Sequence, residues 1–410
     1  MAATTAVDTG LRRSAWPLTR LDVAGAFGDI GVLFPIAIAL ITLNHLNPTA
    51  LFLTAGLTYC LAGWYFRIPI AVQPLKAVAA IALALSLAPT AVSSAGLLMG
   101  VLLLFVGMTN IARWLAKLFT LPIVRGIQLG LGLLLAREGL RLITTHKAGQ
   151  MLPGGPLTAW LVALAGAALL LALRNSRRFP SALVLLAAGI TLGLVLHWGR
   201  LPALSFGLVP LELFHPRWAE LERVLPLLVV PQFALTFGNS IVATENTAHI
   251  LYGEQARRVT VRALSLSIGF VNLVSSAVMG SPLCHGSGGI TAHYRFGART
   301  AKSSYVIGGV CILLALVGRT AVGLLQLIPV AVLGVFLLYV GVQHAAYLRD
   351  IFSRPALLLI AIVVGVVSLL TTNLMWGFLT GFGLEGAFWL YRQLRQPGAG
   401  GNLPVPGGAN

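Results

Sequence analysis

Hydrophobic positions in this chain come in long unbroken blocks, and polar positions gather in the short stretches between them. The apolar blocks end at charged residues, prolines or glycines and then begin again, from the first residues after the N-terminal tail almost to the C-terminus. About 20 consecutive apolar residues are enough to carry a helix across the roughly 30 Å hydrocarbon layer of a bilayer. The pattern therefore predicts an all-α polytopic membrane protein.

The blocks predict fourteen transmembrane segments, seven on each side of a more polar stretch at 199–223. Those of the first half are 21–43, 48–66, 69–87, 94–114, 121–141, 157–173 and 180–198. Those of the second half are 224–243, 259–279, the interrupted stretch 278–300, 303–317, 324–342, 355–371 and 375–392.

Two of these segments, the third and the tenth, carry breaks. In the third, the proline of Gln73-Pro74 disfavours helix at Gln73 but suits the first turn of a helix that follows it. In the tenth, five glycines and a proline interrupt the apolar run between Val278 and Thr300. Irregular backbone at membrane depth must find partners in the protein or in a ligand. Bare N–H groups at a helix start favour an anion, and we expect them after Gln73-Pro74 and at Gly286 to Gly289.

An internal repeat links the two halves. Phe27-Gly28-Asp29 in the first segment matches Phe237-Gly238-Asn239 in the eighth, and in each half the second segment after this match is the broken one. Equivalent segments are seven apart, an odd number, so the halves cross the membrane in opposite directions. The order of these features predicts a 7+7 inverted repeat whose two discontinuous helices meet near the midplane, as in many transporters.

Composition and charge agree with a membrane protein. Only 10% of the 410 residues are charged and 57% are hydrophobic, whereas a soluble domain has about 25% charged residues. The net charge of +17 does not indicate nucleic-acid binding, because no basic soluble domain is present to carry it. With a cytoplasmic N-terminus, twenty of the 28 lysines and arginines fall inside and seven outside. This asymmetry places both termini in the cytoplasm.

The exception to that asymmetry is Lys76, which falls within the membrane next to the first break. A buried lysine is costly, and its usual role is to bind a ligand or to pair with a carboxylate. Asp29 is the intramembrane carboxylate, either protonated during transport, paired with Lys76, or capping a helix. Glu245 is a second candidate for coupling, although a solvated position at the inner boundary is an equal alternative.

Cysteine chemistry is not indicated. Cys60, Cys284 and Cys311 show no metal-ligand spacing, so no metal, cofactor or disulfide framework is expected. Cys284-His285 could suggest a nucleophile and its base, but adjacent residues on a regular element do not face each other, and no orienting carboxylate is near in sequence. We therefore expect that the protein is not an enzyme.

Three motifs resemble a known family. Residues 24–31 (AGAFGDIG) with Pro35, residues 69–79 (PIAVQPLKAVA) and residues 282–299 (PLCHGSGGITAHYRFGAR) are similar to the signature motifs of the molybdate transporters related to the sulfate permeases. The resemblance covers residues 20–395. Ser281-Pro282-Leu283 departs from the usual pattern but keeps the proline. The resemblance implies uptake of molybdate across the plasma membrane by a multi-pass protein.

The resemblance also implies a site and a division into core and gate. The implied substrate-binding residues are Gln73, Lys76, Asn239, Cys284, His285, Gly286, Ser287, Gly288 and Gly289, with Asp29 beside them. The implied domains are a cytoplasmic tail (1–19), a first repeat (20–198; core 20–119, gate 120–198), an extracytoplasmic linker (199–223), a second repeat (224–396; core 224–318, gate 319–396) and a disordered tail (397–410).

Several alternatives stay open. Sulfate and tungstate share the charge and shape of molybdate, so a sulfate-type transporter or a passive anion channel fits the same pattern. A nucleobase permease on this scaffold would need acidic side chains on the eighth and tenth segments, and the tenth has none before Arg295. The coupling ion, proton coupling included, and a homodimeric state are not decided by the sequence.

Overall fold

The computed structural model describes residues 18–109, 111, 112, 115, 120–144, 155–173, 176, 181–198 and 207–395. Within these residues the fold is almost entirely helical. The predicted C-terminal tail (397–410), residues 1–17 of the N-terminal tail and residues 199–206 of the linker lie outside the described residues.

The first half contains a discontinuous third segment. Its elements are α1 (Arg20–Ala26), η1 (Phe27–Asp29), α2 (Ile30–Leu43), α3 (Pro48–Phe66), β1 (Gln73–Pro74), α4 (Lys76–Ala84), α5 (Pro89–Met108), α7 (Leu121–Thr144), α8 (Gly155–Leu173) and α9 (Ser181–Leu196).

The second half is interrupted at the corresponding place. Its elements are α10 (Trp218–Val224), η2 (Leu225–Val229), α11 (Val230–Leu235), η3 (Thr236–Val242), α12 (Ala243–Tyr252), η4 (Gly253–Ala256), α13 (Val261–Ala277), β2 (Leu283–Cys284), α14 (Ser287–Arg295), α15 (Lys302–Leu316), α16 (Gly318–Gln326), α17 (Val330–Ala345), η5 (Ala346–Ile351), α18 (Pro355–Thr371) and α19 (Leu374–Arg395).

Local sequence explains where many of these helices begin. Pro48, Pro89 and Pro355 each open a helix, where the missing proline N–H would have no partner in any case. The side chains of Asn47 and Thr260 cap α3 and α13 by accepting backbone N–H groups.

Some predicted segment boundaries differ from the structure. The run 324–342 was expected to be one span, but α16 ends at Gln326 and α17 begins at Val330, because Pro329 caps the new helix and cannot continue the old one. The segment expected at 94–114 is α5, which runs from Pro89 to Met108 because Pro89 opens the helix. Helix α10 begins at Trp218, within the stretch 199–223 that is predicted to be the linker. The count of fourteen spans and the inverted-repeat relation stay predictions.

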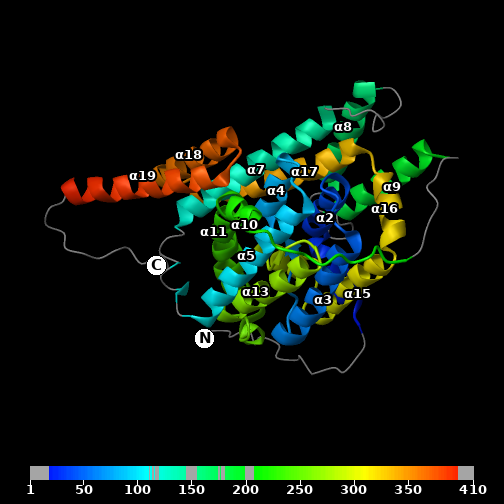
Figure 1. Cartoon of the computed structure of the whole chain (residues 1–410), viewed down its shortest axis with the longest axis horizontal. Helices are drawn as coiled ribbons and strands as arrows, with labels where there is room; N and C mark the ends of the chain where they lie inside the picture. The colour runs from blue at the N-terminus through cyan, green and yellow to red at the C-terminus, as the bar shows by residue number, and fades with distance from the viewer. Residues whose placement is uncertain are drawn as a thin grey trace, which may run out of the picture.

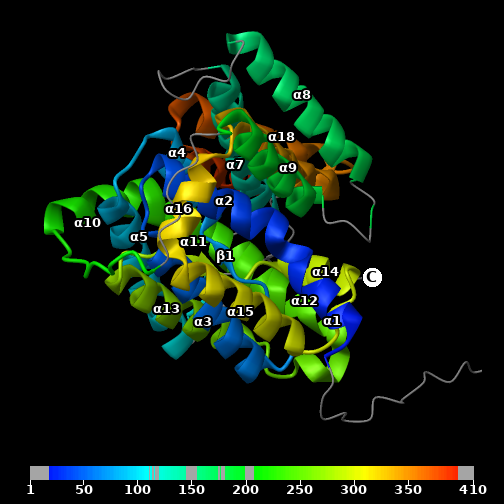
Figure 2. The same cartoon turned by 90° about the vertical axis from the view of Figure 1, so that its right-hand side faces the viewer.

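The helices pack in two groups. In one group α3 packs along α15 and α5 packs along α13; in the other α7 packs against both α17 and α18, and α18 lies along α19. Figures 1 and 2 show α7, α8, α17 and α18 together on one side of the molecule, with α3, α13 and α15 on the opposite side. We call these the α3–α15 group and the α7–α18 group. The first includes η1, α4 and α14, which are joined to it through α1, α2, α5 and the β1–β2 ladder, and the second includes α8 and α9, which pack on α17.

The two broken segments meet inside the α3–α15 group. β1 and β2 form a two-stranded antiparallel ladder in which Gln73 is opposite Cys284 and Pro74 is opposite Leu283. The Leu75 N–H extends this pairing by donating to the Pro282 carbonyl (2.8 Å). Asn272 of α13 binds both the N–H and the carbonyl of Leu283 (2.7 and 3.0 Å). These hydrogen bonds give partners to backbone N–H and carbonyl groups that are not part of a helix, as backbone at membrane depth requires.

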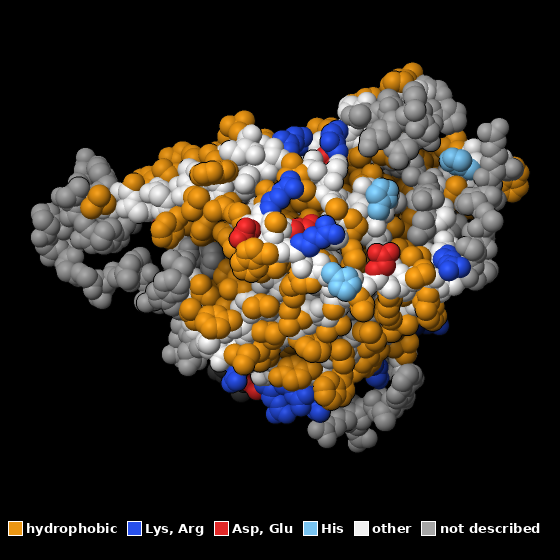
Figure 3. All heavy atoms as spheres, in the orientation of Figure 1, with side chains coloured by type: hydrophobic (Ala, Val, Ile, Leu, Met, Phe, Trp, Pro, Cys, Tyr) orange, Lys and Arg blue, Asp and Glu red, His pale blue; other side chains and the backbone are white. Residues whose placement is uncertain are grey.

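The outer surface of the helices is apolar. Six stretches within the described residues are long and apolar enough to cross a membrane: Arg20–Leu43, Pro48–Phe66, Pro89–Met108, Gly155–Leu173, Trp218–Ala256 and Val330–Ile351. The face drawn in Figure 3 is largely hydrophobic, with charged side chains and histidines gathered across its middle and a basic group at its lower edge. Large exposed side chains such as Trp64, Phe270 and Leu370 suit contact with lipid.

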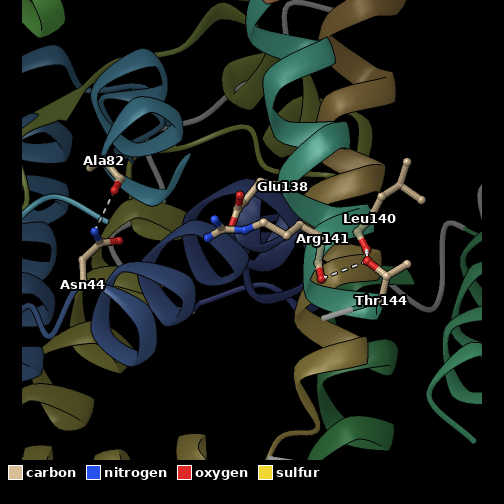
Figure 4. A network of polar contacts seen from close by, with 6 residues as sticks. All are labelled: Asn44, Ala82, Glu138, Leu140, Arg141 and Thr144. Carbon is tan, nitrogen blue, oxygen red and sulfur yellow. Dashed lines mark hydrogen bonds and ion pairs between the residues drawn. The ribbon is translucent and has the colours of Figure 1, made fainter. Parts of the chain in front are cut away.

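An ion pair lies near the C-terminal end of α7. The carboxylate of Glu138, a buried residue, pairs with Arg141 one turn later (2.9 Å). Both side chains extend from α7 to the side on which Asn44 and Ala82 lie, whereas Thr144 folds back onto the Leu140 carbonyl (Figure 4). The ion pair keeps a buried charge compensated.

Candidate functional site

A cavity of about 570 Å³ lies between the two helix groups. The α3–α15 group contributes the two half-helix starts and the first segment, and the α7–α18 group contributes the opposite wall. Lining residues from the first group include Gly28, Asp29, Gln73, Lys76, Ser287, Gly288 and Gly289; those from the second include Ser176, Ser181, Tyr339, Gln343, His344 and Tyr347.

Lys76 is the first residue of α4 and lines this cavity. The residue is only 5% exposed. Within the described part of the chain, its ammonium group makes no hydrogen bond and no ion pair, and Asp29 is therefore not paired with it in this structure. Asp29 is close enough to interact with Lys76 electrostatically but forms no ion pair with it. A buried ammonium group without a direct ion-pair partner is unfavourable, so an anion in the cavity would stabilise it.

The start of α14 opens onto the same cavity. The N–H groups of Gly289 and Ile290 return to the Gly286 carbonyl (3.1 and 3.2 Å). Those of Ser287 and Gly288 meet no acceptor among the described residues, and both residues line the cavity. N–H groups without an acceptor and the positive end of the helix dipole thus lie at the cavity wall, which favours negative charge there.

The start of α4 is different, because a side chain already caps it. Oε1 of Gln232, on α11, accepts the N–H groups of Ala77 (2.7 Å) and Val78 (3.2 Å), and its Nε2 donates to the Thr236 hydroxyl (2.8 Å). The sequence led us to expect bare N–H groups after Gln73-Pro74. Instead, α4 contributes the Lys76 side chain to the cavity while its next two N–H groups are used internally.

Asp29 lies against the first turn of α14. Its carboxylate accepts hydrogen bonds from Gln73 Nε2 (2.5 Å) and from the Tyr59 hydroxyl (3.5 Å). A methyl group added to Gly289 would lie 2.8 Å from Asp29 Cγ, so glycine is required for this approach. A carboxylate and a bound anion would thus occupy the same cavity.

Asn239 does not line the cavity itself, but it contacts Ser287, which does. It lies in η3, a π-helical stretch of the eighth segment, and its Oδ1 accepts the Ser287 hydroxyl (3.0 Å). A π-turn inside a helix often marks a functional position because it redirects side chains. Here Asn239 holds the first residue of α14 rather than facing the cavity itself.

The remaining predicted residues point away from the cavity. Cys284 is buried beside Ser240. His285 is held by the Ala71 carbonyl (2.9 Å) and the Ser267 hydroxyl (2.9 Å). The backbone of Gly286 lies against Gln73 Oε1, and the carboxylate of Glu245 accepts the Val261 N–H at the start of α13 (3.1 Å).

Three residues of the site were not singled out from the sequence. Gln232 could have been noticed as a lone amide in an apolar run. Tyr347 and His344 carry no such signal, since aromatic residues and histidines are common near membrane boundaries. The structure places both in the wall opposite α14.

Paired broken helices over a cavity between two helix groups define a membrane transporter, and the fold agrees with solved transporters. The transmembrane domain of a cyanobacterium bicarbonate transporter, BicA, aligns with a TM-score of 0.64 at 18% identity over 88% of this chain and 97% of that one. The murine Solute Carrier 26 family member A9 anion transporter, in the inward-facing state, aligns with a TM-score of 0.64 at 16% identity, covering 92% of this chain and 70% of that one.

The family is given by the sequence comparison. The family model "Molybdate transporter of MFS superfamily" matches residues 22–135 and 225–343, more than half of the chain. Molybdate transporter 2 of Arabidopsis thaliana is 28% identical over 87% of this chain and 84% of its own length, and Molybdate transporter 1 of Chlamydomonas reinhardtii is 26% identical over 90% and 91%. The chain belongs to the molybdate transporter family, a family of transporters and not of enzymes.

Proposed function

We propose that this protein imports molybdate across the plasma membrane. The single observation that carries the proposal is the buried Lys76, which makes no hydrogen bond or ion pair within the described chain and lines the same cavity as Ser287 and Gly288, whose N–H groups have no acceptor there. The family relationship supplies molybdate as the first candidate among oxyanions.

The anion binds between the half-helix starts. Lys76 supplies the compensating positive charge, and the Ser287 and Gly288 N–H groups donate to the anion oxygens at the positive end of α14. Gln73 lines the cavity while its amide nitrogen is held by Asp29. Asn239 fixes the start of α14 through the Ser287 hydroxyl, and Cys284, His285 and Gly286 shape the loop from behind.

Transport follows from relative movement of the two helix groups. The proposed core (20–119 with 224–318) contains the α3–α15 group, and the proposed gate (120–198 with 319–396) contains the α7–α18 group. Each group packs mainly within itself, and the cavity lies between them. The cavity wall includes Arg295 and Ser176, in regions that the charge asymmetry assigns to the cytoplasm together with both termini. If that orientation holds, this conformation faces inward.

Asp29 couples the anion to a proton in this proposal. An ionised carboxylate and a divalent oxyanion in one cavity repel each other, and a proton on Asp29 removes that repulsion. Glu245 is not used, because its carboxylate is committed to α13. We expect Asp29→Asn to abolish the stimulation of uptake by an inward proton gradient while anion binding is retained.

Sulfate is the nearest alternative substrate. It has the same charge and a similar shape, and backbone N–H groups discriminate weakly between such anions. A nucleobase substrate fits less well, because none of the cavity residues contributed by the eighth and tenth segments is acidic.

Uptake by purified protein in liposomes tests the proposal. Molybdate uptake should be saturable, should rise with an inward proton gradient, and should exceed uptake of sulfate at equal concentration. Uptake of uracil without molybdate would contradict the proposal. Sulfate uptake that excess molybdate does not inhibit would replace it with the sulfate alternative.

A further inference from the structure

The wall opposite α14 presents a tyrosine to the candidate site. Tyr347 belongs to η5, the short helix after α17, and it lines the cavity. A methyl group added to Gly288 would lie 2.8 Å from the Tyr347 hydroxyl oxygen, and it would meet no other atom within 4 Å. The hydroxyl therefore stands directly over the residue whose N–H faces the cavity.

The Tyr347 hydroxyl is unused in the protein itself. It makes no hydrogen bond to any described residue. Its ring, by contrast, is held: the guanidinium carbon of Arg125 lies 5.4 Å from the ring centroid, and the ring of His344 packs edge-on at 6.1 Å. Arg125 is fixed in turn by an ion pair with Asp350 and a hydrogen bond to Gln128 (2.8 Å). A rigid ring with a free donor is preorganised for a ligand.

A tetrahedral oxyanion needs donors on more than one side. Lys76 and the N–H groups of Ser287 and Gly288 all come from the α3–α15 group, so they cover the oxygens that face the half-helices. At least one oxygen points to the opposite wall, where a charge-assisted hydrogen bond is available only from the α7–α18 group.

We propose that the Tyr347 hydroxyl is the ligand that this opposite wall supplies to the bound anion. The inference rests on the proposed function, and it assigns to the gate a direct contact with the substrate. Because Tyr347 and Gly288 belong to different helix groups, this bond exists only while the two groups are in the relative position seen here. Movement of the core away from the gate breaks it, so it contributes to affinity on one side of the membrane only.

Binding measurements on purified protein test the assignment. Molybdate, tungstate and sulfate are titrated separately against the wild type, Tyr347→Phe and the control Tyr305→Phe, which removes a hydroxyl on α15 outside the cavity. Loss of a hydrogen bond to a charged ligand should weaken binding by about tenfold in Tyr347→Phe, with Tyr305→Phe unchanged. A Tyr347→Phe affinity within about twofold of the wild type would overturn the assignment.

The three anions separate this inference from the proposed function. If the wild type binds sulfate but not molybdate, the molybdate proposal fails, and the effect of Tyr347→Phe on sulfate still decides the role of the hydroxyl. If the wild type binds none of the three anions, both proposals fall.

A double-mutant cycle tests the juxtaposition without any ligand. Gly288→Ala places a methyl group against the tyrosine oxygen, whereas in Tyr347→Phe that oxygen is absent. Gly288→Ala should therefore lower the melting temperature of the ligand-free protein more in the wild type than in the Tyr347→Phe background. Equal decreases in both backgrounds would show that the hydroxyl does not stand over Gly288.

Discussion

The helices α4 and α14 each begin just after a strand of the β1–β2 ladder, yet the backbone N–H groups at their starts differ in their partners. Gln232 accepts two of those that open α4, Ala77 and Val78. The first two of α14, at Ser287 and Gly288, remain free beside the cavity. Helix α4 contributes a charged side chain in its first turn, Lys76, whereas the first turn of α14 has no charged side chain.

The difference indicates that the two helix starts contribute to anion binding in different ways. Both helix ends are positive, but a capped end is stabilising for the protein and an open end is available to a ligand. We therefore expect α14 to bind through its backbone and α4 through its lysine. Four substitutions test this division, from the largest expected effect to the smallest.

Gly289→Ala should abolish uptake and destabilise the protein by about 1–3 kcal/mol, because the new methyl group has no space. It would lie 2.7 Å from Gln73 Nε2 and 2.8 Å from Asp29 Cγ. Gly309→Ala on α15 is the control, since nothing lies within 4 Å of its added methyl group. Uptake assays and thermal melting measure both variants. Normal uptake by Gly289→Ala would show that α14 does not need this close approach.

Lys76→Gln should reduce molybdate uptake by about 100-fold or more, because it removes the one positive charge that the α4 start brings to the cavity. The control, Lys302→Gln, neutralises a lysine at the start of α15, outside the cavity, and should transport normally. Radiolabelled or metal-analysed uptake at matched protein levels gives the ratio. Equal uptake by both variants would remove α4 from the site.

Ser287→Ala should weaken molybdate binding by about fivefold, the value of one modest hydrogen bond. The backbone N–H stays in place, but Asn239 Oδ1 loses the hydroxyl that orients the start of α14. Ser265→Ala is the control, since its hydroxyl only returns to the Val261 carbonyl on α13. A loss as large as that of Lys76→Gln would mean that the hydroxyl, and not the backbone, binds the anion.

Gln232→Ala should leave uptake within about twofold of the wild type and lower the free energy of unfolding by about 1 kcal/mol, as loss of a helix cap does. Gln232→Glu keeps an acceptor oxygen at the helix start and should recover most of the stability. Melting in detergent measures the change in stability, and liposome uptake measures transport. Loss of uptake in Gln232→Ala without loss of stability would show that the capped start of α4 also takes part in anion binding.

Much of the fold followed from the sequence because lipid allows few choices. Long apolar runs in a bilayer must be helices, and proline or glycine within them marks a break. The breaks at Gln73-Pro74 and at Cys284-His285-Gly286 were read in this way, and the structure interrupts both segments there and pairs them. The split between α16 and α17 at Pro329 was missed, because the apolar run continues across it.

Side-chain directions at the breaks could not be obtained in the same way. Successive residues of an extended stretch point to opposite sides, so the sequence allows at most one of Cys284 and His285 to face the cavity. Tertiary contacts decide whether either of them does. Both were turned away, His285 by Ala71 and Ser267 from distant segments. Gln232 is 155 residues from Ala77 in the chain, and such a pairing has no local signature.

The short ladder between β1 and β2 has a thermodynamic consequence. It fastens the two half-helices to each other, and Asn272 fastens β2 to α13, so in the proposed movement of the core Lys76 and the α14 amides would stay together as one rigid coordination shell. A shell that travels intact offers the anion the same core donors at both membrane faces, and only contacts from the stationary wall differ between them. A difference in affinity between the two faces then comes from the gate, as with the proposed Tyr347 contact, whereas the direction of net flux is set by the electrochemical gradients of the anion and of any coupled ion.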